Sequence, residues 1–310
     1  MKVLTYLRDD TRRLGLMLDG TVIDPLDAGG DPGFFADTIA FIRGGDAAML
    51  AAHALFGTAA HLSLADLRLL SPMVPTTILC SGSNYRAHNA EKANAPLSGQ
   101  EPEFFVKTGD CVIGPEDPIL HDPRLTQKLD CETELAVVIG KPGRHITVEN
   151  APNHIFGYTI VNDVTARDRQ VRRNAQGFTW YELGRGKAFD SSAPMGPVIV
   201  TADEFGDPQK AMLRTRINGE LRQQSSTADM IWSCADLVHF FSVNFTLRPG
   251  MVILTGTPAG TAWSTDAELG GSWHPAPGLV AATRYCEPGD VVESEIEGIG
   301  VLRNPVASAG

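Results

Sequence analysis

Three acidic residues stand at the ends of two apolar segments that have the pattern of buried strands. Glu132 and Glu134 open the run "LAVVIGK", which is rich in β-branched residues and stops at a glycine, and Asp163 closes the run "FGYTIVND". Alternate residues of a strand share a face, so the two glutamates point the same way and repel each other. We therefore expect either a solvent-exposed strand start or a positive group between these carboxylates.

A divalent cation is one positive group that would satisfy all three carboxylates. Because only oxygen ligands are in view, the pattern favours a hard cation, Mg²⁺, Mn²⁺ or Ca²⁺, over Zn²⁺. The alternative is an ordinary exposed strand start, where acidic residues have no such role.

Two further motifs hold residues suited to proton transfer. In "SNYRAHNAE", a helical turn over residues 85–93 would place His88 and Glu91 on one face, where the carboxylate can orient the imidazole as a general base for water. Lys187 follows Gly186 in an irregular segment, from which it could reach a cleft and stabilise an oxyanion. A surface ion pair and a solvated lysine are the alternatives that the spacing leaves open.

Composition excludes several classes of protein. Of the 310 residues, 43% are hydrophobic, and 26 basic against 37 acidic residues give a net charge of −11, which argues against nucleic acid or an anionic membrane as the partner. No apolar run approaches the roughly 18–20 residues of a membrane span, and charges from Arg8 onward interrupt any signal peptide. The five scattered cysteines fit reduced thiols, so we expect a cytoplasmic protein.

The elements that must position these residues are mostly strands. A hairpin signal at Asp19–Gly20 and a helical stretch interrupted at Gly44–Gly45 predict a small α+β domain over residues 1–72. Over residues 73–310, strand patterns are separated by turns, and "MIWSCADLVHFFSVNF" is the clearest amphipathic helix. Long helices do not alternate with the strands, so we expect a mixed α+β, β-rich fold and not a doubly wound parallel sheet.

The order of these motifs resembles that of the fumarylacetoacetate hydrolase (FAH) family. The likeness runs from about residue 75 to residue 306, through "SNYRAHNAE", "FFVKTGDCVIGP", "DCETELAVVIGK", "GYTIVNDVTARDRQ", "RGKAFDSSAPMGP", "INGELRQ", "ILTGTPAG" and "PGDVVESEIEGIGVLRNPV". It implies an FAH-like C-terminal domain, a mixed β-roll or β-sandwich, with a small N-terminal α+β domain. It also implies a homodimer.

The resemblance gives individual residues a role. The family's ligands of Mg²⁺ or Mn²⁺ match Glu132, Glu134 and Asp163. Its catalytic dyad, which activates water, and its oxyanion-stabilising lysine match His88, Glu91 and Lys187. Its substrate contacts match Arg167, Gln170 and Thr257. Tyr85 lies in the first matching motif and receives no role.

The family implies chemistry on small diketo or 2-oxo acids, whose enolate a divalent cation stabilises. We predict an Mg²⁺-dependent hydrolase that cleaves a C–C bond in a 1,3-diketo acid of the acylpyruvate or fumarylpyruvate type, because His88 and Glu91 suit an attacking water. The alternative is a decarboxylase or an isomerase of 2-oxo or 2-hydroxydienoate acids on the same metal site. A catalytically silent metal-containing protein is the third possibility.

The chain departs from many family members after "TGTPAG". A longer insertion, residues 261–285, separates this turn from the last strands and contains "ELGGSW". Some hydrolytic members carry a similar insertion, which favours hydrolysis. We expect the insertion to border the site, with a role in dimer contact as the alternative.

Overall fold

The computed structural model describes residues 1–57, 59–91, 101–272 and 274–310. It begins with an antiparallel meander of strands β1 (Lys2–Arg8), β2 (Thr11–Leu18) and β3 (Thr21–Ile23). The predicted hairpin between β2 and β3 is confirmed, because Asp19 and Gly20 have φ angles of 49° and 79°. Positive φ at both central residues is what a tight two-residue hairpin turn requires.

The predicted helical stretch forms α1 (Pro32–Phe35) and α2 (Thr38–Leu55). Asp31 and Asp37 cap the two helices by accepting backbone N–H groups of their first turns. The interruption predicted in this stretch is a kink inside α2, where Gly45 takes a φ of 52° that a helix does not allow.

The meander continues into the largest sheet of the molecule through the antiparallel pair β1–β15. Eleven strands form this sheet in the order β3-β2-β1-β15-β11-β10-β18-β5-β6, with β4 beside β1 and β7 beside β15. Its further strands are β4 (Arg68–Leu70), β5 (Ile78–Gly82), β6 (Glu103–Lys107), β7 (Val112–Ile113), β10 (Thr133–Ile139), β11 (Ile155–Asn162), β15 (Ala193–Thr201) and β18 (Val252–Leu254).

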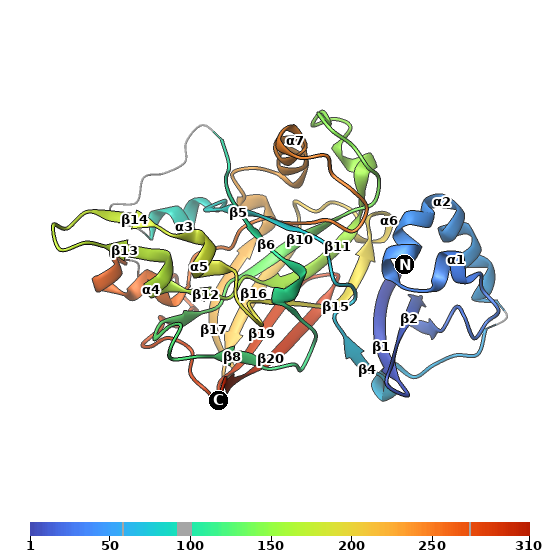
Figure 1. Ribbon diagram of the computed structural model, residues 1–310, viewed down its shortest axis with the longest axis horizontal. Helices are drawn as coiled ribbons and strands as arrows, with labels where there is room; N and C mark the ends of the chain where they lie inside the picture. The colour runs from blue at the N-terminus through green and yellow to red at the C-terminus, as the bar shows by residue number, and fades with distance from the viewer. Residues whose placement is uncertain (58, 92–100, 273) are drawn as a thin grey trace.

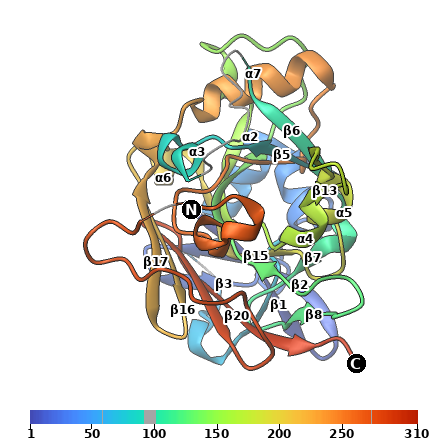
Figure 2. The ribbon, with the colours of Figure 1, turned by 90° about the vertical axis from the view of Figure 1, so that its left-hand side faces the viewer.

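A second, five-stranded sheet has the order β17-β16-β19-β20-β8, and Figure 2 labels β17, β16, β20 and β8 of this sheet. Its strands are β8 (Ile119–His121), β16 (Met212–Ile217), β17 (Glu220–Ser226), β19 (Val291–Ile296) and β20 (Gly300–Ser308). Asn218 and Gly219, with φ angles of 53° and 81°, form the tight turn between β16 and β17.

Short elements complete the chain. Two small ribbons pair β9 (Leu129–Asp130) with β12 (Thr165–Ala166) and β13 (Val171–Arg173) with β14 (Thr179–Tyr181). The remaining α-helices are α3 (Arg86–Ala90), α4 (Arg167–Gln170), α5 (Leu183–Lys187), α6 (Ala202–Phe205) and α7 (Cys234–Asn244). The 3-10 helices are η1 (Leu64–Asp66), η2 (Gly109–Cys111), η3 (Ala151–His154), η4 (Thr227–Asp229), η5 (Ala262–Thr265) and η6 (Ala267–Leu269).

Apolar side chains cover both faces of the large sheet. On one face, Leu135 and Val137 of β10 belong to a core that includes Leu213 of the second sheet and the buried side of α7. On the other face, Ala136 and Val138 belong to a core shared with α1 and α2. This explains why residues 135–139 of β10 form a continuous apolar run: a strand segment buried on both faces has no polar side.

The predicted mixed α+β, β-rich fold is confirmed, and so is the amphipathic helix α7. Figure 1 shows α1 and α2 at one end of the molecule and the β13–β14 ribbon at the other. The division into residues 1–72 and 73–310 stays a prediction, and the first strands extend the large sheet. In the part of the chain that the structure describes, no helix is long and apolar enough to cross a membrane.

Candidate active site

Neighbouring strands bring the three predicted metal ligands together. Glu134 lies on β10, Glu132 directly precedes this strand, and Asp163 directly follows the adjacent strand β11. The backbone N–H of Asp163 donates to the carbonyl of Glu132 over 2.8 Å. One carboxylate oxygen of each residue lies within 4.8 Å of the others, and all three side chains are buried. The alternative of an exposed strand start is therefore wrong.

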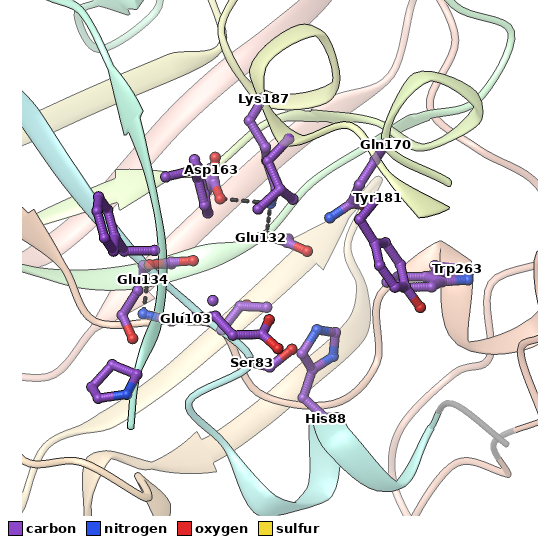
Figure 3. A pocket seen from close by; sticks show the side chains of 18 of the residues that line it. Ser83, His88, Glu103, Glu132, Glu134, Asp163, Gln170, Tyr181, Lys187 and Trp263 are labelled. Atoms are coloured by element: carbon purple, nitrogen blue, oxygen red, sulfur yellow. Dashed lines mark hydrogen bonds and ion pairs between the residues drawn. The ribbon is translucent and has the colours of Figure 1, made fainter. Parts of the chain in front are cut away.

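Basic side chains offset the charge of this acidic cluster. Lys187 Nζ lies 2.6 Å from a carboxylate oxygen of Glu132 and 2.6 Å from one of Asp163 (Figure 3). Arg167 binds Glu132 from a second side. The other oxygen of Asp163 lies 2.7 Å from the Nζ of Lys107, a lysine without exposed surface. Of the two alternatives that the sequence left open, the structure shows the second: positive groups, in the form of buried lysine and arginine side chains, lie next to these carboxylates.

The two glutamates differ in their affinity for protons. Burial disfavours the ionised form of Glu132, but Arg167 and Lys187 outweigh it and hold the pKa of this carboxyl well below its usual range. Burial, together with the charges of Asp163 and Glu132, raises the pKa of Glu134 well above its usual range. Glu134 accepts one backbone N–H, from Gly256 over 2.6 Å.

A hard divalent cation fits this cluster. The donors are carboxylate oxygens, which Mg²⁺ and Mn²⁺ prefer. Among residues 1–57, 59–91, 101–272 and 274–310, no Lys, Arg or His lies within ion-pair distance of Glu134. Glu132 and Asp163 therefore have basic partners in this part of the chain, whereas Glu134 has none. Ionising a buried carboxyl group without a charged partner is costly, in agreement with the raised pKa of Glu134, and a metal ion on this cluster would remove that cost.

The predicted dyad forms at the end of α3, where Glu91 directly follows the helix. His88 Nδ1 lies 2.5 Å from a carboxylate oxygen of Glu91, and both side chains are buried. The other oxygen of Glu91 accepts the backbone N–H of Gly260, which ties α3 to the glycine-rich turn. The predicted helical turn 85–93 is seen as α3 and Glu91, whereas residues 92 and 93 lie outside the described part.

Lys187 ends the short helix α5 and points into the cavity, as the sequence suggested. It is 3% exposed, so the alternative of a solvated lysine is wrong. The preceding Gly186 lets α5 lie against α4, because a Cβ there would be 2.7 Å from the Cα of Gln170. Burial lowers the affinity of Lys187 for its proton, but Asp163 and Glu132 outweigh it and raise the pKa of this lysine. Lys187 is therefore a cation at neutral pH.

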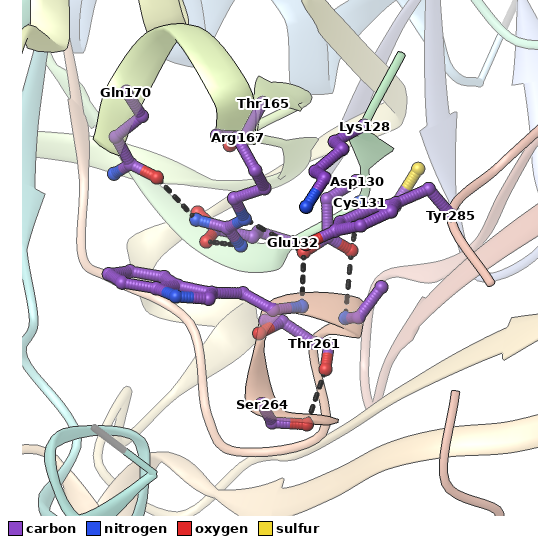
Figure 4. Close-up of polar contacts among 12 residues, drawn as sticks. Lys128, Asp130, Cys131, Glu132, Thr165, Arg167, Gln170, Thr261, Ser264 and Tyr285 are labelled. Carbon is purple, nitrogen blue, oxygen red and sulfur yellow. Dashed lines mark hydrogen bonds and ion pairs between the residues drawn. The ribbon is translucent and has the colours of Figure 1, made fainter. Parts of the chain in front are cut away.

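The predicted substrate contacts also lie at the cavity, with different surroundings. Arg167 uses all three nitrogens within the protein, donating to Asp130, Glu132 and Gln170 (Figure 4). Gln170 accepts the hydrogen bond from Arg167 with its amide oxygen, so its amide NH₂ group is the part that could donate to a substrate. Thr257 donates to the carbonyl of Thr133 over 3.0 Å. Direct substrate contacts of these residues stay predictions.

A cavity of about 690 Å³ joins the parts of the site. The acidic cluster, His88 and Lys187 line it together with five aromatic residues, namely Phe104, Phe105, Tyr181, Phe240 and Trp263. Trp263 belongs to the insertion 261–285, so the expectation that this segment borders the site is confirmed. The cavity thus combines a charged region with several aromatic side chains, an arrangement typical of small-ligand sites.

Sequence reasoning missed three buried residues of this site: Lys107, Asp130 as the partner of Arg167, and Trp263. Lys107 carried a signal, since it shares a strand face with Phe105, two residues before it, in a run of apolar residues. Asp130 and Trp263 carried none, because their contacts are not local: Asp130 meets Arg167 across 37 positions and the backbone of Trp263 across 133.

Comparison with known proteins agrees with the geometry. The model of the C-terminal domain of fumarylacetoacetate (FAA) hydrolase matches residues 77–307. This chain belongs to the FAH family. The matched range contains every predicted site residue, so the chain is a metal-dependent enzyme of a family that acts on small keto acids.

Three similar proteins illustrate the activities found in the family. Oxaloacetate tautomerase fahd2, mitochondrial, from Xenopus laevis is 39% identical over 99% of this chain and 90% of its own length. The fumarylacetoacetate hydrolase of Exiguobacterium antarcticum superposes with a TM-score of 0.78, at 36% identity over 99% of both chains. Maleylpyruvate hydrolase from Sphingobium sp. SYK-6, solved with manganese(II) and pyruvate, gives 0.76 at 27% identity over the whole of both chains.

Proposed function

We propose that this protein is a metal-dependent keto–enol tautomerase of small 2-oxo acids, with oxaloacetate as the first substrate to test. The observation that carries the proposal is Lys187, a protonated amine 2.6 Å from two candidate metal ligands. A tautomerase needs proton donors and acceptors beside the place where an enolate forms. The 39% identity to an oxaloacetate tautomerase over nearly the whole chain supports this isomerase activity over the hydrolysis that the sequence suggested first.

In the proposed mechanism, Glu132, Glu134 and Asp163 hold Mg²⁺ or Mn²⁺. The bound cation would supply a Lewis acid that stabilises the negative charge of an enolate. Manganese in the maleylpyruvate hydrolase structure and the hard donors of this cluster support either ion. Arg167 of α4 and Lys187 of α5 also bind Glu132, so these two side chains hold this candidate metal ligand in place.

The chain's own residues move the proton. His88 is oriented by Glu91 at Nδ1, so we assign the transfer to Nε2, which takes a proton from the carbon next to the keto group. Lys187, a cation in the resting site, donates a hydrogen bond to the oxygen on which charge develops. In the keto-to-enol direction the proton taken from carbon is delivered to that oxygen. In the enol-to-keto direction a proton is delivered to carbon, so neither direction consumes water.

Hydrolysis of a C–C bond is the second candidate, and the dyad favours it. The same His88–Glu91 pair that takes a proton from carbon could take one from water, and the structure of a maleylpyruvate hydrolase is similar to this chain. Decarboxylation would share the enolate and the metal site.

Product analysis distinguishes these reactions. The Mg²⁺-loaded protein is mixed with enol oxaloacetate and, separately, with fumarylpyruvate, and ultraviolet absorbance is followed alongside mass spectrometry in ¹⁸O-labelled water. The proposal expects fast loss of the oxaloacetate enol without change of mass. Pyruvate with an ¹⁸O-labelled acid from fumarylpyruvate would establish the hydrolase, and released CO₂ the decarboxylase. The homodimer and the cytoplasmic location remain predictions.

A further inference from the structure

The insertion after the glycine-rich turn is fastened at two points, to Asp130 of strand β9 and to Lys128, which directly precedes this strand. Asp130 accepts the backbone N–H groups of Ala262 over 3.0 Å and of Trp263 over 3.1 Å, the first two residues of η5. Lys128 binds Asp266 over 2.7 Å. The first N–H groups of a helix have no partner within it, so the carboxylate of Asp130 caps η5 from a distant part of the chain.

The same carboxylate also binds the guanidinium group beneath the tryptophan. Arg167 Nε donates to Asp130 over 2.8 Å, and both side chains are almost completely buried. The guanidinium carbon of Arg167 lies 5.1 Å from the ring centre of Trp263, within the range of a cation–π contact. Asp130 thus fixes the indole twice, through the backbone of Trp263 and through the side chain on which the indole rests.

The indole forms an aromatic wall together with Tyr181. Their ring centres lie 6.2 Å apart, and both residues line the cavity on the side away from Glu134 (Figure 3). The Nε1 of Trp263 donates to the carbonyl of Leu269, so the ring is held at both ends. A substrate whose oxo-acid end lies at the acidic cluster would extend its distal group towards this wall.

We propose that Asp130 is a positioning residue that fixes Trp263 as a specificity wall, and that this wall favours 2-oxo acids with a planar distal group. A rigid indole gains most from a flat, conjugated or aromatic group that can stack on it, and least from a methyl group. The inference rests on the proposed function only for the oxo-acid end of the ligand, since the wall acts in binding and not in proton transfer.

Ligand affinities test this proposal without turnover. Calorimetry on the Mn²⁺-loaded full-length protein compares pyruvate, which ends in a methyl group, with phenylpyruvate, which ends in a ring. We expect Trp263→Ala and Asp130→Asn each to weaken phenylpyruvate binding about fivefold and to change pyruvate binding less than about twofold. Asp207→Asn, an exchange of an exposed aspartate, is the matched control and should change neither affinity.

The double variant tests whether Asp130 acts through Trp263. If it does, Asp130→Asn combined with Trp263→Ala weakens phenylpyruvate binding no more than Trp263→Ala alone. Additive losses would overturn the positioning role, as would equal losses for both ligands in Asp130→Asn. A wild-type protein that binds phenylpyruvate no more tightly than pyruvate, or binds neither, would overturn the specificity wall.

Hydrogen exchange keeps the test valid if Asp130→Asn does not fold. In the wild-type protein the amides of Ala262 and Trp263 should be protected, because Asp130 accepts both. Rapid exchange of these two amides would contradict the proposal. A protein that shows the expected affinities but does not convert enol oxaloacetate would refute the tautomerase and leave the specificity wall standing.

Discussion

Replacing Lys187 by methionine removes a buried cation from the acidic cluster and shortens the unbranched side chain by only one atom. The stem of Lys187 lies beside Phe105, whose ring centre is 5.2 Å from Nζ, and methionine can fill the same apolar space. The change therefore deletes charge and hydrogen-bond donors and little packing. What is lost is the donor that the proposed mechanism aims at the developing oxyanion.

The magnitude follows from the role of a single preorganised donor. Loss of one such donor lowers kcat by roughly 100- to 1,000-fold, or about 3–4 kcal/mol. The substrate KM should change only a few-fold, since the charge develops on the way to the transition state. Metal affinity should not fall, because Lys187 is protonated and shares Glu132 and Asp163 with the metal.

Steady-state loss of the oxaloacetate enol, followed by ultraviolet absorbance across substrate and Mg²⁺ concentrations, measures these quantities. The matched control is Lys210→Met, which removes an exposed lysine paired with Asp207. The assigned role would be refuted by a kcat within about threefold of wild type, or by a loss that lies entirely in KM.

Four further predictions concern the metal, the base and the fold. Asp163→Ala should abolish Mn²⁺ binding in calorimetry while circular dichroism shows an intact fold; tight binding would remove Asp163 from the ligands. Because the pKa of Glu134 is raised, Mn²⁺ must displace a proton, so its affinity should rise with pH and binding should release protons to the buffer. His88→Asn should lower kcat for tautomerisation of enol oxaloacetate by roughly 100-fold or more, because Nε2 of His88 is the assigned base; a kcat close to that of the wild-type protein would remove His88 from the proton transfer. Asp24→Asn should lower the free energy of unfolding by about 1–3 kcal/mol at pH 7, because buried Asp24 accepts hydrogen bonds from Tyr6 and Arg13.

The pH dependence of the Asp24 effect has a definite sign. Burial alone would raise the pKa of Asp24, but the hydrogen bonds from Arg13 and Tyr6 outweigh it and lower that pKa below its usual value of 3.8. The contribution of this carboxylate is therefore fully present above the unfolded pKa and is lost as the pH falls through the folded pKa. Urea titrations at pH 7 and pH 3 should show the difference between Asp24→Asn and wild type shrinking at the lower pH. An equal difference at both would contradict the ion-pair explanation.

The metal cluster could be predicted because its geometry is local to two strands. The alternation in "ETELAVVI" put Glu132 and Glu134 on one face, and the abrupt end of the next strand supplied Asp163. The sequence left open whether these carboxylates are exposed to solvent or lie next to a positive group. It could not say that this group is Lys187 with Arg167, because strand periodicity does not tell which distant helix packs against a given strand end.

Contacts over long sequence separations account for what was missed. Asp130 acts on Trp263 across 133 positions, and Gly260 reaches Glu91 across 169. No local pattern encodes such pairs, which depend on how the two sheets pack. The reaction type was also outside the reach of the sequence, since hydrolysis and tautomerisation use one set of residues and differ in whether water or carbon gives up the proton.

The central claim is that the buried acidic cluster holds a divalent cation that makes this chain a tautomerase. The most direct measurement is the decay rate of enol oxaloacetate against Mg²⁺ concentration, for the wild-type protein and for Glu134→Gln. We predict that the wild-type rate rises to saturation with Mg²⁺ and that the oxaloacetate mass is conserved, while Glu134→Gln stays near the uncatalysed rate. A rate that is equal without Mg²⁺, or a Glu134→Gln variant as active as wild type, would contradict the account.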